Sequence, residues 1–259
     1  MTQVNVSIES AIGTLEMSND AKRNSLSRGF LSELSDGFEE CRQRGARVVI
    51  LRARRGSTVW SAGHDVEELP ERGIDPLGPN DPLPRFTRLI EEFPAPVIAS
   101  VEGTVWGGAC QVAFTCDLVI ATAGSTFALT PARLGVPYHL SGLATFVHCL
   151  GPQVAREMAF TGQPLSAERL HDLGVVNRIV TAAELETVTH SVAAEIAGNA
   201  PLAISSMKQQ IHALVTEHAV SAESLGRIEA SRRVAYSSND YVEGIAAFKS
   251  RRRPRFNGH

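Results

Sequence analysis

The chain has 259 residues, of which 43% are hydrophobic and 20% charged, so it is long enough to bury a substantial core. The formal net charge of −3 gives no general attraction to nucleic acid or to an anionic membrane. No apolar run reaches the length of a bilayer-spanning helix and no signal-like segment opens the chain, so we expect a cytoplasmic protein. The four cysteines show no metal-ligand spacing, which predicts free buried thiols.

The first third of the chain predicts a hairpin, a helix and a buried strand. Residues 3–18 contain two β-type runs broken at Gly13, which indicates a hairpin that opens a sheet. Residues 27–45 place apolar side chains at helical spacing between a serine and a glycine. Residues 47–54 form an apolar strand that leads into the loop SAGHD at 61–65. Candidate site residues that follow a strand are typical of α/β crossover architectures.

The middle of the chain alternates strands and helices. Residues 71–84 are rich in Pro, Gly and Asp and predict a mobile loop without a regular element. The segments that follow it predict a helix at 85–93, a strand at 95–103, a helix at 107–116, a strand at 117–124 and an extended piece at 126–130. This order favours parallel strands joined by right-handed crossovers. Amphipathic helices dominate beyond about residue 142, including 164–174, 181–218 and 222–236, so we expect a core at 1–200 and a helical region at 201–259.

Two glycine turns place backbone amides where a ligand can approach. Gly63 precedes His64, and the pair Gly107 and Gly108 precedes the apolar run ACQVAF, which predicts the start of a buried helix. Free N–H groups, one of them at a helix N-terminus, form a site for negative charge. The sequence therefore predicts an anion site between the two turns.

Five separated segments resemble the crotonase, or enoyl-CoA hydratase/isomerase, superfamily. They are AKRNSLS, SAGHD, EGTVWGGA, TFALTPARLGVP and EGIAAFKSRRRPRF. Within that superfamily, SAGHDVEELP, DPLPRFTRLI, TPARLGVPYHLSG and RPRFNGH are most similar to the methylmalonyl-CoA decarboxylases. The resemblance implies an α/β protein, a crotonase-like ββα spiral with a C-terminal helical extension, assembled as homotrimers or pairs of trimers. It also implies that the thioester carbonyl lies between the backbone N–H groups of His64 and Gly108, with the backbone of Ala62, Gly63, His64, Asp65 and Val66 along the rest of the CoA.

Hydratases of this superfamily use two glutamates, and both are missing here. The corresponding positions hold Gln111 and, depending on a one-residue shift, Thr130 or Pro131. Between 102 and 157 the one acidic residue is Asp117, which begins an apolar strand away from the glycine turn. Without an acid or base carboxylate, the chain is poorly equipped for hydration. Decarboxylation favours a carboxylate-free pocket, because a second anion would repel the leaving carboxylate.

The resemblance also suggests roles for individual side chains. Tyr138 matches the tyrosine that holds the substrate carboxylate, and a phenol can donate a hydrogen bond without adding charge. Thr130 is a possible second contact or simply a strand-end residue, and Trp106 lines the acyl pocket or belongs to the core. Gln111 fills the space of the hydratase glutamate, and His139 is expected to be a surface loop residue.

A local basic cluster is expected around the anionic CoA. The candidates are Lys22 and Arg23 before the first helix, and Phe248 and Arg251, which match an aromatic residue and a cation three positions later on the last helix of the family, often contributed by a neighbouring subunit. The cation is usually lysine in the family, and arginine keeps the charge with a different geometry.

The sequence thus predicts conversion of methylmalonyl-CoA to propionyl-CoA without biotin or metal, by a protein that binds acyl-CoA and neither nucleic acid nor membrane. Two alternatives stay open: a hydratase or isomerase of the same superfamily, and an acyl-CoA- or RNA-binding relative that has lost catalysis. Hydration of crotonyl-CoA would indicate the first, and salt-dependent RNA retention without turnover the second.

Overall fold

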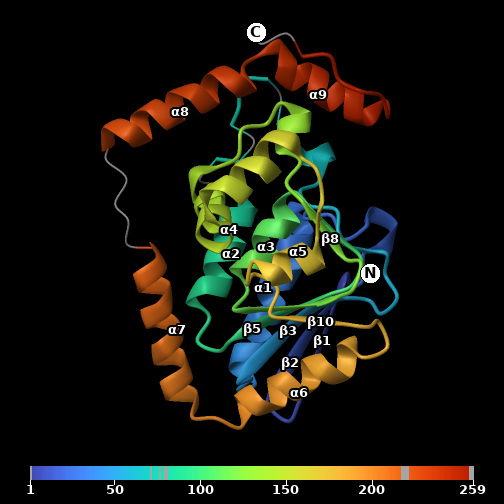
Figure 1. Cartoon of the computed structure of the whole chain (residues 1–259), viewed down its shortest axis with the longest axis vertical. Coiled ribbons are helices and arrows are strands. Elements are labelled where there is room, and N and C mark those ends of the chain that lie inside the picture. The colour runs from blue at the N-terminus through green and yellow to red at the C-terminus, as the bar shows by residue number, and fades with distance from the viewer. Residues whose placement is uncertain (1, 71, 76, 79–80, 217–221, 257–259) are drawn as a thin grey trace.

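The computed structural model describes residues 2–70, 72–75, 77–78, 81–216 and 222–256. Its centre is formed by two sheets (Figure 1). The larger sheet has the strand order β1 (Val4–Glu9), β2 (Ile12–Met17), β3 (Val48–Ala53), β5 (Val97–Val101), β7 (Leu118–Thr122) and β10 (Arg178–Val180). The smaller one has the order β4 (Val59–Ser61), β6 (Thr104–Trp106), β8 (Thr126–Ala128) and β9 (Leu165–Ser166).

Each turn of the spiral adds one strand to the larger sheet and one to the smaller sheet. After β3, β5 and β7 in the larger sheet the chain enters β4, β6 and β8 in the smaller one, and within each of these two sets the neighbouring strands pair in parallel. Only β1 with β2 and β8 with β9 pair antiparallel among the described strands. The expected ββα spiral is therefore confirmed, and it brings the ends of β4 and β6 together at one place.

The N-terminal hairpin is confirmed, but the expected break at Gly13 is wrong. The turn lies at Ser10 and Ala11, both with positive φ, and Gly13 pairs within β2. A Cβ at Gly13 would lie 2.6 Å from the sulfur of Cys41, so the glycine is needed because helix α1 (Arg28–Gln43) packs closely on this strand.

Helices cover both faces of the larger sheet, following the alternation of side chains along its strands. In β3, Val49 and Leu51 pack toward α1 (Arg28–Gln43) and α2 (Pro82–Glu92), whereas Val48 and Ile50 pack toward α6 (Leu185–Ala197). Helix α1 starts as expected, because Ser27 accepts a hydrogen bond from the N–H of Phe30 at 3.2 Å.

Helix α2 begins earlier than the sequence analysis expected. Residues 82–84 were assigned to an irregular loop, but Asp81 caps the helix by accepting a hydrogen bond from the N–H of Leu83 at 2.9 Å, and Pro82 occupies the first turn. Residues 72–75 and 77–78 form no regular element. The rest of the expected loop, residues 71, 76 and 79–80, lies outside the described residues, and the mobility of the loop stays a prediction.

The remaining α-helices follow β6 in the chain. They are α3 (Gly108–Thr115), α4 (Leu140–Thr161), α5 (Ala167–Asp172), α7 (Pro201–Thr216), α8 (Ala222–Tyr236) and α9 (Asn239–Lys249). Part of the expected helix at 164–174 is strand β9 instead. Helix α7 runs along one side of the molecule, while α8 and α9 lie across one end (Figure 1). Lys208 anchors α7 through Asp117 at 2.7 Å. The division of the chain at residue 200 stays a prediction.

The expectation of free cysteines is confirmed. All four cysteines are free, three of them buried, while Cys149 is only partly buried. No helix within the described ranges is long and apolar enough to cross a membrane.

Candidate active site

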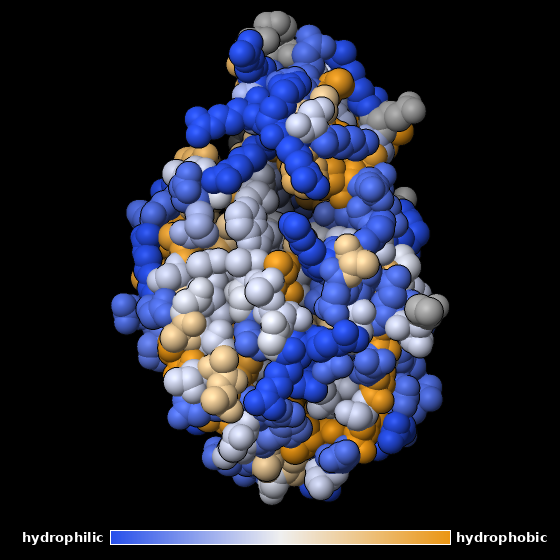
Figure 2. Space-filling model, turned by 90° about the vertical axis from the view of Figure 1, so that its right-hand side faces the viewer, coloured by the Kyte–Doolittle hydropathy of each residue, from blue (hydrophilic) through white to orange (hydrophobic). Residues whose placement is uncertain are grey.

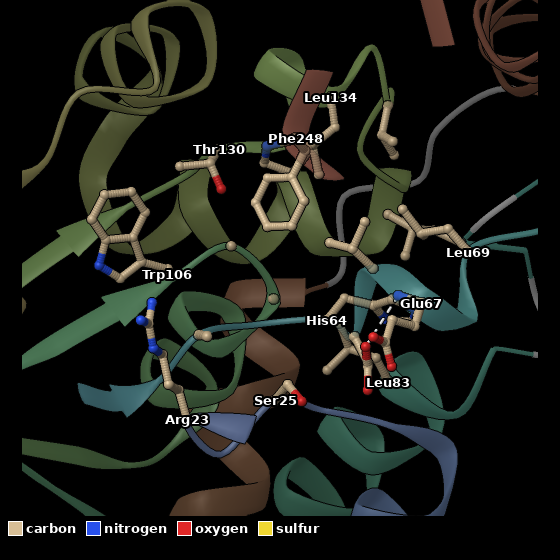
Figure 3. A pocket seen from close by; sticks show the side chains of 18 of the residues that line it. Arg23, Ser25, His64, Glu67, Leu69, Leu83, Trp106, Thr130, Leu134 and Phe248 are labelled. Carbon is tan, nitrogen blue, oxygen red and sulfur yellow. Dashed lines mark hydrogen bonds between the residues drawn. The ribbon is translucent and has the colours of Figure 1, made fainter. Parts of the chain in front are cut away.

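A cavity of about 570 Å³ lies where the two glycine turns meet (Figure 3). Its walls come from β4, β6, η3 (Pro131–Leu134) and α9, which the spiral brings together. The lining includes most of the expected site residues: Lys22, Arg23, Ala62, His64, Asp65, Val66, Trp106, Gly108, Thr130, Tyr138 and Phe248. Trp106 is therefore a wall residue rather than a core residue. Gly63, Gln111 and Arg251 do not line the cavity itself.

The two turns touch each other, and only glycine fits at their contact. Gly63 has φ +83°, and a Cβ there would overlap the carbonyl oxygen of Trp106 and lie 3.1 Å from the nitrogen of Gly108. A Cβ at Gly108 would lie 2.7 Å from the side chain of Leu83 and 3.7 Å from the nitrogen of His64. The N–H of Leu26 donates to the carbonyl of Gly63 at 2.7 Å and fixes the first turn.

The backbone N–H groups of His64 and Gly108 are the chemical centre of this contact. Within the described part of the chain, no hydrogen-bond acceptor is recorded for either amide. Gly108 is the first residue of α3, so its N–H has no intrahelical partner and carries the positive end of the helix dipole. Two such donors beside a cavity can bind an oxygen that becomes negative.

Tyr138 supplies a neutral donor to the same cavity. Burial raises the pKa of its phenol far above the ordinary value, so the group stays protonated. Its hydroxyl donates to the side-chain oxygen of Gln111 at 3.2 Å, and its ring packs edge-on against Phe146. Gln111 is 4% exposed and lies behind the tyrosine instead of facing the cavity.

Thr130 and His139 flank the segment that carries Tyr138. Thr130 lines the cavity on the same side as Trp106 (Figure 3). The expectation of a surface loop histidine at 139 is wrong in part, because His139 caps α4 by accepting a hydrogen bond from the N–H of Ser141 at 3.3 Å. Partial burial lowers the pKa of His139, which favours its neutral form.

The expectation of a carboxylate-free pocket holds for one side of the cavity and is wrong for the other. Asp65 and Glu67 both line it, and both pair with Lys22, at 3.2 and 2.9 Å. Glu67 lies on the His64 side, away from Trp106 (Figure 3). Lys22 therefore offsets part of their charge, and Glu67 stands apart from the wall that carries Thr130.

Asp81 interacts electrostatically with two cavity residues, His64 and Tyr138, and was not expected near the site. Burial raises the pKa of this carboxyl, while the neighbouring His64 and Arg28 oppose the rise. Its charge also acts on Tyr138. The pair Asp81 and Pro82 is a helix-start signal, and it could have revealed both the start of α2 and a carboxyl close to the cavity.

The basic residues expected to bind CoA lie along one side of the cavity. Arg23 extends toward Trp106 (Figure 3), and Phe248 reaches the cavity from α9 of the same chain. Arg251 is not on the last helix as expected, because α9 ends at Lys249. It lines an adjoining groove of about 950 Å³ together with Lys22 and Arg23. The face on which α9 ends carries long hydrophilic side chains in its upper part (Figure 2).

No group of three or more His, Cys, Asp or Glu side chains within the described ranges is arranged to hold a metal ion.

Comparison with known proteins gives a consistent result. The family model for enoyl-CoA hydratase/isomerase matches residues 7–259. Methylmalonyl-CoA decarboxylase of Escherichia coli (strain K12) is 41% identical over 256 residues, with 99% of this chain and 98% of that protein covered. A solved structure of methylmalonyl-CoA decarboxylase in complex with 2-nitronate-propionyl-CoA, 41% identical, superposes with a TM-score of 0.97 over 99% of both chains. Another, complexed with 2S-carboxypropyl CoA, is 40% identical, with a TM-score of 0.97 over 100% of this chain and 99% of that one. The resemblance seen in the sequence is confirmed, and the chain belongs to the enoyl-CoA hydratase/isomerase family.

Proposed function

We propose that this protein decarboxylates methylmalonyl-CoA to propionyl-CoA through a thioester enolate. The observation that carries the proposal is one cavity that combines a neutral phenol with two backbone amides for which the described residues provide no acceptor. The positions at which hydratases carry glutamates hold Gln111 and Thr130 or Pro131. The 41% identical relative named methylmalonyl-CoA decarboxylase supports the same substrate. So do the related structures whose ligands are a 2-nitronate and a 2-carboxypropyl derivative of CoA.

The substrate is held at both ends. The thioester oxygen lies between the N–H groups of His64 and Gly108, and the CoA runs past Ala62–Val66 toward Arg23 and Arg251. At the acyl end, Tyr138 and Thr130 hold the carboxylate so that its C–C bond stands perpendicular to the plane of the carbonyl. This alignment lets the bonding electrons enter the carbonyl system as the bond breaks.

The two amides act on the negative charge that develops during the reaction. As CO₂ leaves, the electron pair moves toward the thioester oxygen, and the two amides stabilise the resulting enolate oxygen. Removing one preorganised donor of this kind typically costs ~10² to 10³ in rate. A proton that comes from solvent then adds to the α-carbon in place of CO₂. None of these steps needs biotin or a metal ion, and we propose that neither is used.

The residues of this chain argue against the two alternative functions. Hydration requires carboxylates that handle water, and the equivalent positions are Gln111 and the pair Thr130–Pro131. An RNA-binding role is disfavoured by the net charge of −3.

The test is a mass-spectrometric time course of the purified protein with methylmalonyl-CoA, malonyl-CoA and crotonyl-CoA, with a chelator present. The proposal predicts loss of CO₂ from methylmalonyl-CoA and no addition of water to crotonyl-CoA. Rapid hydration of crotonyl-CoA, or activity that the chelator abolishes, would contradict it.

The proposal includes a cytoplasmic homotrimer or pair of trimers. The location rests on the sequence pattern, and the assembly is supported by an apolar stripe on α7. Met207, Ile211 and Leu214 share one face of this helix and are 53%, 62% and 80% exposed, more apolar surface than a solvated helix normally shows. Leu214→Asp should lower the mass measured by sedimentation, whereas Gln209→Asp, on the opposite face, should not. A monomeric wild-type protein would contradict the assembly.

A further inference from the structure

The hydrogen bond between Tyr138 and Gln111 fixes the direction of the phenol proton. A phenol has a single proton, and here the hydroxyl of Tyr138 donates it to the side-chain oxygen of Gln111 at 3.2 Å. Tyr138 lines the cavity whereas Gln111 lies behind it. The proton therefore points away from the cavity in this structure.

Gly142 makes room for this pair. It lies in the first turn of α4, and a Cβ there would overlap the ring of Tyr138, lying 2.7 Å from its Cδ1, and would stand 2.9 Å from the side-chain oxygen of Gln111. The ring cannot easily give way, because it is packed edge-on against Phe146. The glycine therefore sets the positions of both hydrogen-bonding groups.

A neutral amide suits the position behind the phenol for a chemical reason. Glutamine carries an acceptor and two donors, so its amide can turn and donate to the phenol oxygen once the phenol proton has moved elsewhere. A carboxylate can only accept, so it would retain the phenol proton and would add a buried negative charge close to the substrate carboxylate.

We infer that Gln111 and Gly142 are positioning residues that allow Tyr138 to turn its proton from Gln111 to the carboxylate of the substrate. This inference rests on the proposed function. It explains how the acyl end of the cavity recognises a carboxylate. When the ligand binds, the phenol donates to the carboxylate and the amide of Gln111 donates to the phenol oxygen. In the resulting chain of hydrogen bonds, the phenol and the amide each keep a partner.

The test compares 2-carboxypropyl-CoA with propyl-CoA, which differ only by the carboxylate, in binding measured by calorimetry. Gln111→Glu should reduce the preference for the carboxylate ligand by ~10- to 100-fold, the range of a hydrogen bond to a charged group, and leave the affinity for propyl-CoA unchanged. Gln111→Met should cause a smaller loss. Equal weakening of both ligands, or an unchanged preference, would overturn the inference.

A double-mutant cycle separates positioning from general damage. In a Tyr138→Phe background, Gln111→Met should change the carboxylate preference less than about twofold, because its effect passes through the missing hydroxyl. An equal loss in both backgrounds would overturn the inference. Gly142→Ala should lower the same preference, while Gly29→Ala, at a helical glycine with no atom near its added Cβ, should not.

These binding ratios do not depend on turnover. A wild-type protein that prefers 2-carboxypropyl-CoA but releases no CO₂ from methylmalonyl-CoA would refute the proposed reaction and leave the positioning role intact. A protein that releases CO₂ while Gln111→Glu keeps the full carboxylate preference would refute the positioning role alone.

Discussion

The contact between the two glycine turns offers a sharp test of the proposed oxyanion site. In Gly63→Ala, the new methyl group would collide with the carbonyl oxygen of Trp106 and approach the nitrogen of Gly108 to 3.1 Å. Both are backbone atoms, so the collision is relieved only if the turns move apart. That movement displaces the amides of His64 and Gly108 from a shared oxygen, and the loss of one such donor costs ~10² to 10³ in kcat.

A second cost of this substitution has nothing to do with the site. Gly63 has φ +83°, where an alanine is strained by about 1 to 2 kcal/mol. Gly124 has nearly the same conformation, φ +82°, with nothing near its added Cβ. Gly124→Ala therefore measures the strain without the collision, and both variants should lose about 2 to 8 °C in melting temperature from that strain.

The assay is release of CO₂ from methylmalonyl-CoA under saturating substrate, together with a thermal melt of each variant. Gly63→Ala should show the large loss in kcat, and Gly124→Ala should keep kcat within about twofold of wild type. If Gly63→Ala retained the wild-type kcat, the two amides would not form the oxyanion site. An equal loss in both variants would show that backbone strain, not the displaced amides, lowers activity.

Three further predictions address other parts of the site. Tyr138→Phe should lower kcat by ~10- to 100-fold while the affinity for CoA stays the same, and a raised KM with normal kcat would make it a binding residue only. Arg251→Gln should raise KM with little change in kcat, an effect that added salt should reduce, and a salt-independent loss of kcat would contradict its role at the CoA. Burial raises the folded-state pKa of Asp81, so its carboxyl costs stability as the pH rises above 3.8. Asp81→Asn keeps a capping oxygen and should therefore melt at a higher temperature than wild type at pH 7, with the two melting temperatures converging near pH 3.8. A lower melting temperature of the variant at pH 7 would contradict this.

The sequence predicts much of the fold because local signals and tertiary packing agree in most segments. The serine before α1 and the apolar runs of β3, β5 and β7 are unambiguous. The hairpin turn was misplaced for a physical reason. Gly13 was assigned to a turn, but it is needed inside a strand for the close approach of Cys41, while Ser10 and Ala11 adopt the positive φ angles of the turn.

The candidate site was only partly predictable. The two glycine turns can be recognised in the sequence because only glycine allows them to approach each other. Tyr138 can be recognised because it follows the turn at Gly135. The pairing of Lys22 with Asp65 and Glu67 joins residues more than 40 positions apart, so no local pattern indicates it. Gly142 has no local turn to mark it, because its role is to leave space for a ring that approaches from outside its own helix.

The most direct measurement is the reaction of methylmalonyl-CoA in heavy water, followed by mass spectrometry of the acyl group. If the site stabilises a thioester enolate and then allows its protonation, the product is propionyl-CoA that carries one solvent deuterium on the α-carbon. Recovery of methylmalonyl-CoA with its carboxylate intact and its α-hydrogen exchanged would contradict the account, because it would show a site that removes a proton instead of releasing CO₂.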